Sequence, residues 1–216
     1  MTDSLTTLIS KVQNILGDSG GTYFTTAIGT AAVRQALTEF NLKVPQLLAV
    51  TITGVNDQYE YELSDEDESA VKILDVLQQG ENQDEIDIPL TYDDYIEDER
   101  IFFRLRQPVT TNDTLITRYT ANHTINGLDS QVESTIQARH DQIIVNGAAA
   151  WSIWTRAIAR VETINLSQDQ SDNYRELAIR LYSTFQAGLD RAARRSSAVG
   201  EPDTRAWNDR YHYWGQ

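Results

Sequence analysis

The chain of 216 residues contains no cysteine. Disulfides, thiolate nucleophiles and cysteine-ligated zinc are therefore excluded. It also has no run of about 18 apolar residues, the length that a transmembrane helix requires. Its first residues, Met1 to Ser4, lack the basic and apolar pattern of a secretory signal. We therefore expect a protein that is made in a reducing cytoplasm and has no membrane partner.

Sequence motifs for catalysis are also missing. There is no phosphate-binding loop, no dinucleotide-binding glycine pattern and no nucleophile elbow. The three histidines are far apart in the sequence, and only His140 has a neighbouring carboxylate, Asp141. A lone histidine at the start of a helix is more often a capping or surface residue than a base. We expect no enzymatic activity, no catalytic residue and no cofactor.

Positive charge is scarce, since 18 basic residues face 32 acidic ones and the net charge is −14. The balance is 0 from residue 1 to 45, −13 from 46 to 128 and −1 from 129 to 216. A strongly acidic middle between near-neutral flanks is typical of an inserted subdomain. We predict an N-terminal helix pair (1–45), an acidic β-rich insertion (46–128), long helices that complete the bundle (129–195) and a C-terminal arm (196–216).

The flanks show helical periodicity. Apolar residues from Leu5 to Leu16 share one helical face, and the glycine-rich segment after them predicts its end. Thr25 or Thr26 is a candidate cap for a second helix that ends before Pro45. A third helix is expected from about 134 to 164 and a fourth from about 169 to 195.

The middle shows the alternation of short strands. Strands are expected around 48–52, 59–63, 71–77, 100–106 and 114–120. The predicted fold class is therefore α+β: about four bundled helices, a small inserted antiparallel β-domain or barrel, and an extended C-terminal arm.

The third predicted helix carries a run of small residues. Gly147 to Ala150 follow an apolar run and precede two tryptophans. Glycine inside a helix costs roughly 1 kcal/mol relative to alanine, so Gly147 is expected to have a packing role. The interpretation is a close helix–helix contact rather than a ligand site. Its predicted helix-packing residues are Gly147, Ala148, Ala150, Trp151 and Trp154.

Acidic clusters leave two interpretations open. The groups at 65–68, 84–87 and 93–99 are solvated loops, or they bind divalent cations. The first lacks the glycine and the ligand spacing of a calcium loop, which favours solvated loops and predicts no metal ligand. Binding of nucleic acid is disfavoured because no broad basic face is available.

The last residues combine a polar spacer with aromatic side chains. Two tryptophans and two tyrosines lie within residues 207–214. Aromatic residues and arginines are enriched at interface hot spots. We predict an arm that becomes ordered on a partner or a neighbouring subunit; the alternative is packing onto its own domain. The predicted arm residues are Arg205, Trp207, Arg210, Tyr211, Tyr213 and Trp214.

Three segments resemble the head-to-tail connector, or adaptor, proteins of tailed bacteriophages. The opening segments 5–18 and 31–41 are similar to the first helix pair of that family. The segment from Ile136 to Ala150 resembles its helix with a His–acid pair and a Gly-Ala-Ala-Ala run, although Ala138 stands where relatives often have proline. The segment 174–195 is similar to its final long helix, and the middle strands match an insertion of larger members without a specific motif.

The resemblance implies a structural virion protein of the neck, made in the host cytoplasm. Such proteins form a ring, usually of twelve subunits, between the portal and the next neck, stopper or tail protein. The ring extends the channel through which DNA passes without specific binding. The resemblance makes Asp93, Asp94, Glu97 and Asp98 the candidates to face that channel. It also implies that the predicted arm binds the portal or a neighbouring subunit. The alternatives are another tail or baseplate binding module, or an acidic protein that binds divalent cations. A stable trimer in solution would favour the baseplate alternative, and calcium titration would test the last one.

Overall fold

The computed structural model describes residues 3–63, 70–79, 87–98, 100–111, 113–161 and 168–200. Contacts divide the chain into two compact units. Met1–Val44 and His123–Gln216 form one, here called the helical unit, and Pro45–Asn122 form the other, here called the β unit. The chain therefore leaves the helical unit once, builds the β unit and returns.

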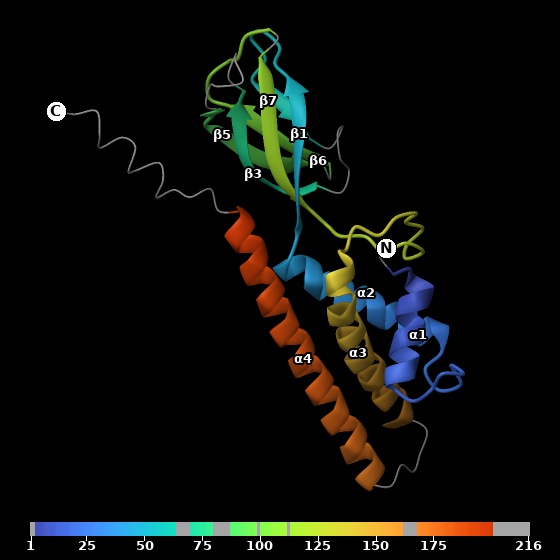
Figure 1. Ribbon diagram of the computed structural model, residues 1–216. Coiled ribbons are helices and arrows are strands. Elements are labelled where there is room, and N and C mark those ends of the chain that lie inside the picture. The colour runs from blue at the N-terminus through green and yellow to red at the C-terminus, as the bar shows by residue number, and fades with distance from the viewer. Residues whose placement is uncertain are drawn as a thin grey trace, which may run out of the picture. The chain divides into compact units, whose positions relative to one another are not determined.

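Four α-helices make up the described part of the helical unit (Figure 1). They are α1 (Leu5–Ile15), α2 (Thr26–Lys43), α3 (Asp141–Val161) and α4 (Gln168–Gly200). Helix α3 packs against each of the other three. A shared core joins them, with Phe40, Ile144 and Phe185 completely or almost completely buried. The helices are thus held together by apolar residues from both ends of the chain.

The first two helices confirm the predicted pair and show why each begins where it does. Ser4 caps α1, since its side chain accepts a hydrogen bond from the Thr7 backbone N–H. Thr25 caps α2 in the same way through the Ile28 backbone N–H. Gly17 has a φ of 70° just after α1, a conformation that glycine adopts without strain.

The predicted bounds of the later helices were wrong in two places. Helix α3 begins at Asp141 rather than near Ser134, after a short 3-10 turn. The preceding residues bond elsewhere: the Thr135 N–H donates to the Thr124 carbonyl, and the Ser134 hydroxyl donates to the Asp3 carbonyl. Helix α4 continues to Gly200, five residues past Arg195, so residues 196–200 of the predicted arm are helical.

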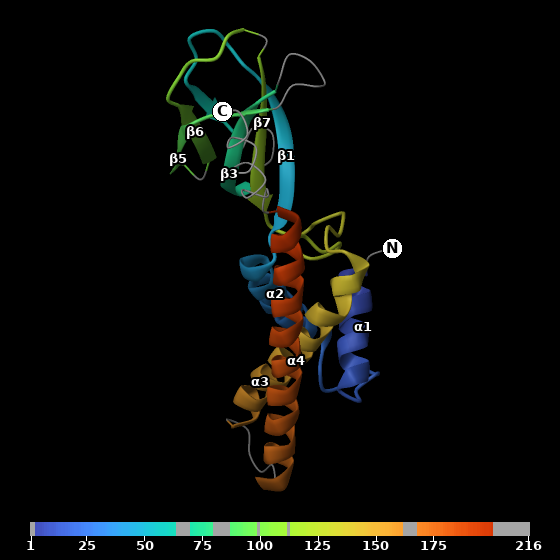
Figure 2. The same ribbon diagram turned by 60° about the vertical axis from the view of Figure 1, so that its left-hand side comes forward.

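The β unit contains two antiparallel sheets (Figure 2). One sheet has the order β1-β7-β3-β4 and the other the order β2-β6-β5. The strands are β1 (Gln46–Thr53), β2 (Glu60–Glu62), β3 (Ala70–Gln78), β4 (Ile88–Pro89), β5 (Tyr92–Glu97), β6 (Arg100–Leu105) and β7 (Thr114–Ala121). This confirms the α+β class.

Both sheets of the β unit contribute to one apolar core. Its members include Ile73 and Leu115 from the first sheet. The second sheet contributes Phe103 of β6, and Leu63 lies directly after β2. Tyr61 stacks on Phe103 with ring centroids 5.4 Å apart. The five predicted strands are all present, whereas β4 and β5 were not predicted.

Candidate functional site

The small-residue run of α3 lies where this helix meets α4. A Cβ atom added to Gly147 would lie 2.9 Å from two ring carbons of Phe185, which is completely buried. Ala148 and Ala150 are also completely buried. The absence of a side chain at Gly147 therefore allows the Phe185 ring to lie directly on the α3 backbone.

The two tryptophans beside this contact form an aromatic cluster with α4. Trp151 and Trp154 meet edge to face with ring centroids 5.0 Å apart. Trp154 lies at the same distance from the ring of Tyr182. Edge-to-face and tilted pairs are favourable geometries for aromatic rings. The cluster thus extends the α3–α4 contact beyond Gly147.

Glu39 of α2 joins this cluster through hydrogen bonds, a role that the sequence reading missed. Its Oε1 accepts from the Trp151 indole N–H at 2.7 Å. Its Oε2 accepts from the Tyr182 hydroxyl at 2.9 Å and from the Gln186 amide at 3.1 Å. Burial, followed by the bond to Glu39, raises the pKa of the Tyr182 hydroxyl. The only signal in the sequence was the place of Glu39 next to the apolar face of α2.

Two histidines lie against Phe40 in the core of the helical unit. The rings of His123 and His140 each lie 5.4 Å from the Phe40 ring, measured between centroids. Burial lowers the pKa of His123, although hydrogen bonds to the backbone of Thr135 and Val44 oppose it. Burial also lowers the pKa of His140, and the nearby positive charge of Arg139 adds to that effect. Both imidazoles are therefore held neutral as part of the core.

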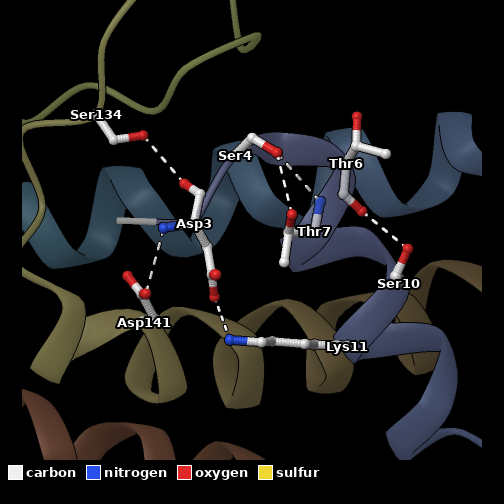
Figure 3. Close-up of polar contacts among 8 residues, drawn as sticks. All are labelled: Asp3, Ser4, Thr6, Thr7, Ser10, Lys11, Ser134 and Asp141. Atoms are coloured by element: carbon white, nitrogen blue, oxygen red, sulfur yellow. Dashed lines mark hydrogen bonds and ion pairs between the residues drawn. The ribbon is translucent and has the colours of Figure 1, made fainter. Parts of the chain in front are cut away.

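The adjacent His140 and Asp141 do not form a catalytic pair in this structure. The buried Nδ1 of His140 has no hydrogen-bond partner in the described part of the chain. Asp141 instead contacts the N-terminal segment, since its Oδ2 accepts from the Asp3 backbone N–H at 3.4 Å (Figure 3). Asp3 also pairs with Lys11. Burial and the charge of Asp3 raise the pKa of Asp141. This cluster ties the chain start to the beginning of α3.

The acidic residues predicted to lie in a loop belong mainly to a strand. Asp93, Asp94 and Glu97 are exposed positions of β5, and only Asp98 lies in the turn after it, with a φ of 48°. In the register of β5 and β6, Asp93 lies opposite Arg104 and Glu97 opposite Arg100.

Part of the charge of this strand is neutralised. Asp93 forms an exposed ion pair with Arg106 at 3.0 Å. The hydrogen bond from Arg106 holds the pKa of the Asp93 carboxyl below its usual value. The sequence signal that was missed is the match between Asp93 and Glu97 and the arginines that lie opposite them in β6, because opposite charges across two strands stabilise their pairing.

Several predicted residues lie outside the described residues. These are the arm residues Arg205, Trp207, Arg210, Tyr211, Tyr213 and Trp214, the acidic groups at 65–68 and 84–86, and His212. Within the described ranges, no group of three or more histidine or carboxylate side chains is arranged to hold a metal ion. No helix in the described part of the chain is both long and apolar enough to cross a membrane.

Comparisons with known proteins find distant likeness among solved structures. No protein-family model matches the chain, and no curated protein matches it significantly. Among solved structures, the chain is similar to one from the neck of an empty GTA particle computed with C6 symmetry. The two are 11% identical, with 66% of this chain and 76% of that chain covered and a TM-score of 0.32. At this identity and TM-score the two chains are only remotely alike.

Proposed function

We propose that this protein is a structural adaptor of a phage neck, which forms a ring between the portal and the next neck or tail protein. The observation that carries the proposal is the order of elements in the helical unit. A helix pair comes first, the β unit is inserted, and α3 with its buried Gly147–Ala150 run then packs on the long α4. These helices contain the three segments that resemble the connector family.

The chemistry of the described residues supports a structural role. Polar groups of the helical unit, such as the partly buried Glu39 and the buried Asp141, accept hydrogen bonds from neighbouring helices and the chain start. A ring subunit needs a rigid body of this kind, because its neighbours contact a fixed surface. In this proposal the helical unit is that body, and the residues after Gly200 bind the portal or the adjacent subunit.

The direct test is docking to isolated portal rings. The purified protein should form a ring on the portal, and electron microscopy with native mass measurement would show the ring and its subunit number. Deleting residues 201–216 should abolish docking and leave the melting temperature nearly unchanged, because these residues are assigned to the interface. A truncated protein that docks normally would contradict the role of the arm. A full-length protein that never joins the portal would contradict the adaptor function.

The acidic β5 surface is proposed to face the DNA channel or its mouth, where negative charge would keep DNA from adhering. The sharpest variant is Asp94→Lys with Glu97→Lys, because both side chains are exposed and Asp98 has a φ that disfavours lysine. The fold should persist, since exposed charges contribute little to stability. Particles that carry the variant should eject DNA more slowly.

A matched control places the same charge change on the helical unit. Glu133 and Glu176 are exposed there, so Glu133→Lys with Glu176→Lys changes the net charge equally. Normal ejection by the control and slow ejection by the β5 variant would support the channel assignment. Equal ejection rates for both variants would place the β5 surface outside the channel.

A further inference from the structure

Strand β1 leaves one long backbone edge open. It is an outer strand that pairs with β7 along all eight of its residues, and no described strand pairs with its other side. The ladder continues at Gly54, whose N–H donates to the Asp113 carbonyl at 2.7 Å. Because bonded pairs alternate in an antiparallel ladder, every second residue of β1 directs its N–H and C=O away from β7. These residues are Leu47, Ala49, Thr51 and Thr53.

The other outer strands of the β unit are protected against pairing. Strands β4 and β2 have only two and three residues. Strand β5 carries three carboxylates. Short strands and charged side chains are the usual devices that prevent edge-to-edge association. Strand β1 has neither device, since no charged residue occurs from Val44 to Asn56.

Both faces of β1 are uncharged and only partly covered. Leu48, Val50 and Ile52 are partly buried against the core of the β unit. On the opposite face, Leu47 is 42% exposed. A strand added at this edge would cover apolar side chains on both faces and satisfy the open backbone groups at the same time.

We propose that β1 is the site where a second copy of this chain binds, through antiparallel β1–β1 pairing centred on Val50. In this register Leu48 lies opposite Ile52 of the other copy, and the two Val50 side chains meet. Ala49 then forms a hydrogen-bonded pair with Thr51, and Leu47 with Thr53. The partly covered side chains of one copy thus complete the core edge of the other.

The register of β1 on itself favours a second copy as the partner, because apolar side chains then meet apolar side chains. Two chains with a net charge of −14 repel each other over most of their surfaces. The uncharged stretch 44–56 is a place where two copies can approach without bringing carboxylates together. The pairing uses only the β unit and does not rest on the proposed adaptor function. A two-fold β1–β1 contact joins two chains and then closes, so it cannot by itself build a larger ring. The proposed dimer is therefore a state of the protein before it joins any ring.

The association should depend on concentration, because one strand pair is smaller than a standard interface of about 1,600 Å². Sedimentation equilibrium of the full-length protein should show the mass rising from one chain toward two as concentration increases. Thr51→Pro removes an open N–H without touching the β7 ladder, so it should weaken dimerisation about tenfold or more.

Two single lysine variants test whether the effect of the proline comes from the open edge. Ala49→Lys places a charge at the open edge, and Leu74→Lys places one at an exposed position of β3 in the same sheet. We expect Ala49→Lys to remain monomeric and Leu74→Lys to dimerise like the wild type. Circular dichroism would verify that each variant is folded. A wild type that is monomeric at every concentration, or folded edge variants that dimerise normally, would overturn the proposal.

Single cysteines test the register, because the chain has no cysteine of its own. Val50→Cys should cross-link rapidly under mild oxidation, since the two residues meet at the two-fold axis. Val71→Cys is the control, because Val71 is 48% exposed on β3. A cysteine there can cross-link only when two copies collide at random. Faster cross-linking at position 71 than at position 50 would exclude this register and pairing. Docking to the portal is measured separately, so failure of one proposal leaves the other intact.

Discussion

Glu39 connects three helices through one carboxylate. The Trp151, Tyr182 and Gln186 donors come from α3 and α4, so removing the acceptor leaves them without their partner. These donors are only partly buried, so water can replace part of the lost bonding, and a typical hydrogen bond contributes about 0.5–1.5 kcal/mol. We expect Glu39→Ala to lower the free energy of unfolding of the helical unit by about this amount, measured by urea unfolding followed by tryptophan fluorescence.

Two comparisons show whether the network causes that loss. Glu39→Gln keeps an acceptor oxygen and should lose less than Glu39→Ala. Glu176→Ala removes a carboxylate whose ion pair with Arg180 is largely exposed, so it should change stability by less than about 0.5 kcal/mol. Equal losses for Glu39→Ala and Glu176→Ala would show that the Glu39 bonds contribute nothing specific.

The two histidines at Phe40 predict the direction of the pH dependence of stability. Their pKa values are lowered by burial in the folded protein, whereas in the unfolded chain they titrate near 6.5. The unfolded chain therefore binds protons that the folded protein does not accept. Stability should be fully present above pH 6.5 and should fall as the pH decreases below it.

The test is the slope of unfolding free energy between pH 7 and about 5.5, where few carboxylates titrate. The double variant His123→Gln with His140→Gln should flatten that slope, while His212 remains in both proteins. The absolute stability of the variant is not the readout, because glutamine packs differently from histidine. An unchanged slope in the double variant would assign the pH dependence to other groups.

At the scale of elements, the contact between α3 and α4 depends on Gly147. Gly147→Ala forces Phe185 to move, which typically costs ~1–3 kcal/mol, and the better helix propensity of alanine returns only ~1 kcal/mol. We expect a net loss of up to about 2 kcal/mol, and a larger loss for Gly147→Leu. Thermal melting of the variants would measure the effect.

A second helical glycine supplies the matched control. A Cβ at Gly188 of α4 would meet the Ile143 side chain at 3.1 Å, and Ile143 is only partly buried and can adjust. Gly188→Ala should therefore stay within about 0.5 kcal/mol of the wild type, because the propensity gain offsets the contact. If both alanine variants melt alike, the close approach at Gly147 has no special energetic role.

Periodicity predicted the elements whose structure depends on local signals. The cap at Thr25 and the apolar face of α2 are visible in the sequence, because each acts within a few residues. The segment Tyr92–Glu97 looked like an acidic loop, since its strand depends on pairing with β6. The start of α3 was placed too early because residues 134–135 bond to distant backbone groups. Long-range pairing is the information that a local pattern lacks.

At the scale of the molecule, the charge distribution follows the division into units. The acidic excess lies between residues 46 and 128, and contacts assign Pro45–Asn122 to the β unit. The glutamate network and the small-residue contact both lie within the helical unit. The partners of Glu39 could not be predicted because Trp151 and Tyr182 are over 100 residues away from it in the chain. Each unit has its own apolar core. Independent cores predict independent folding.

The ends of the β unit lie next to each other, which makes this prediction testable by excision. Gln46 pairs with Ala121, so their Cα atoms are about 4.5–5.5 Å apart. The two chain segments that lead into and out of the β unit are also bonded within the helical unit. The His123 N–H donates to the Asn41 side chain at 2.9 Å. Replacing residues 45–122 with a short Gly-Ser linker should therefore give a folded helical protein.

Tryptophan fluorescence separates the two units, because all four tryptophans lie at or beyond residue 151 and none lies in the β unit. In the full-length protein, fluorescence should follow the helical unit alone, while circular dichroism should follow both units and show two transitions. The excised protein should reproduce the fluorescence transition of the full-length chain, and residues 45–122 alone should reproduce the other. A single coincident transition by both probes, together with an unfolded excision product, would show that the helical unit needs the β unit to fold.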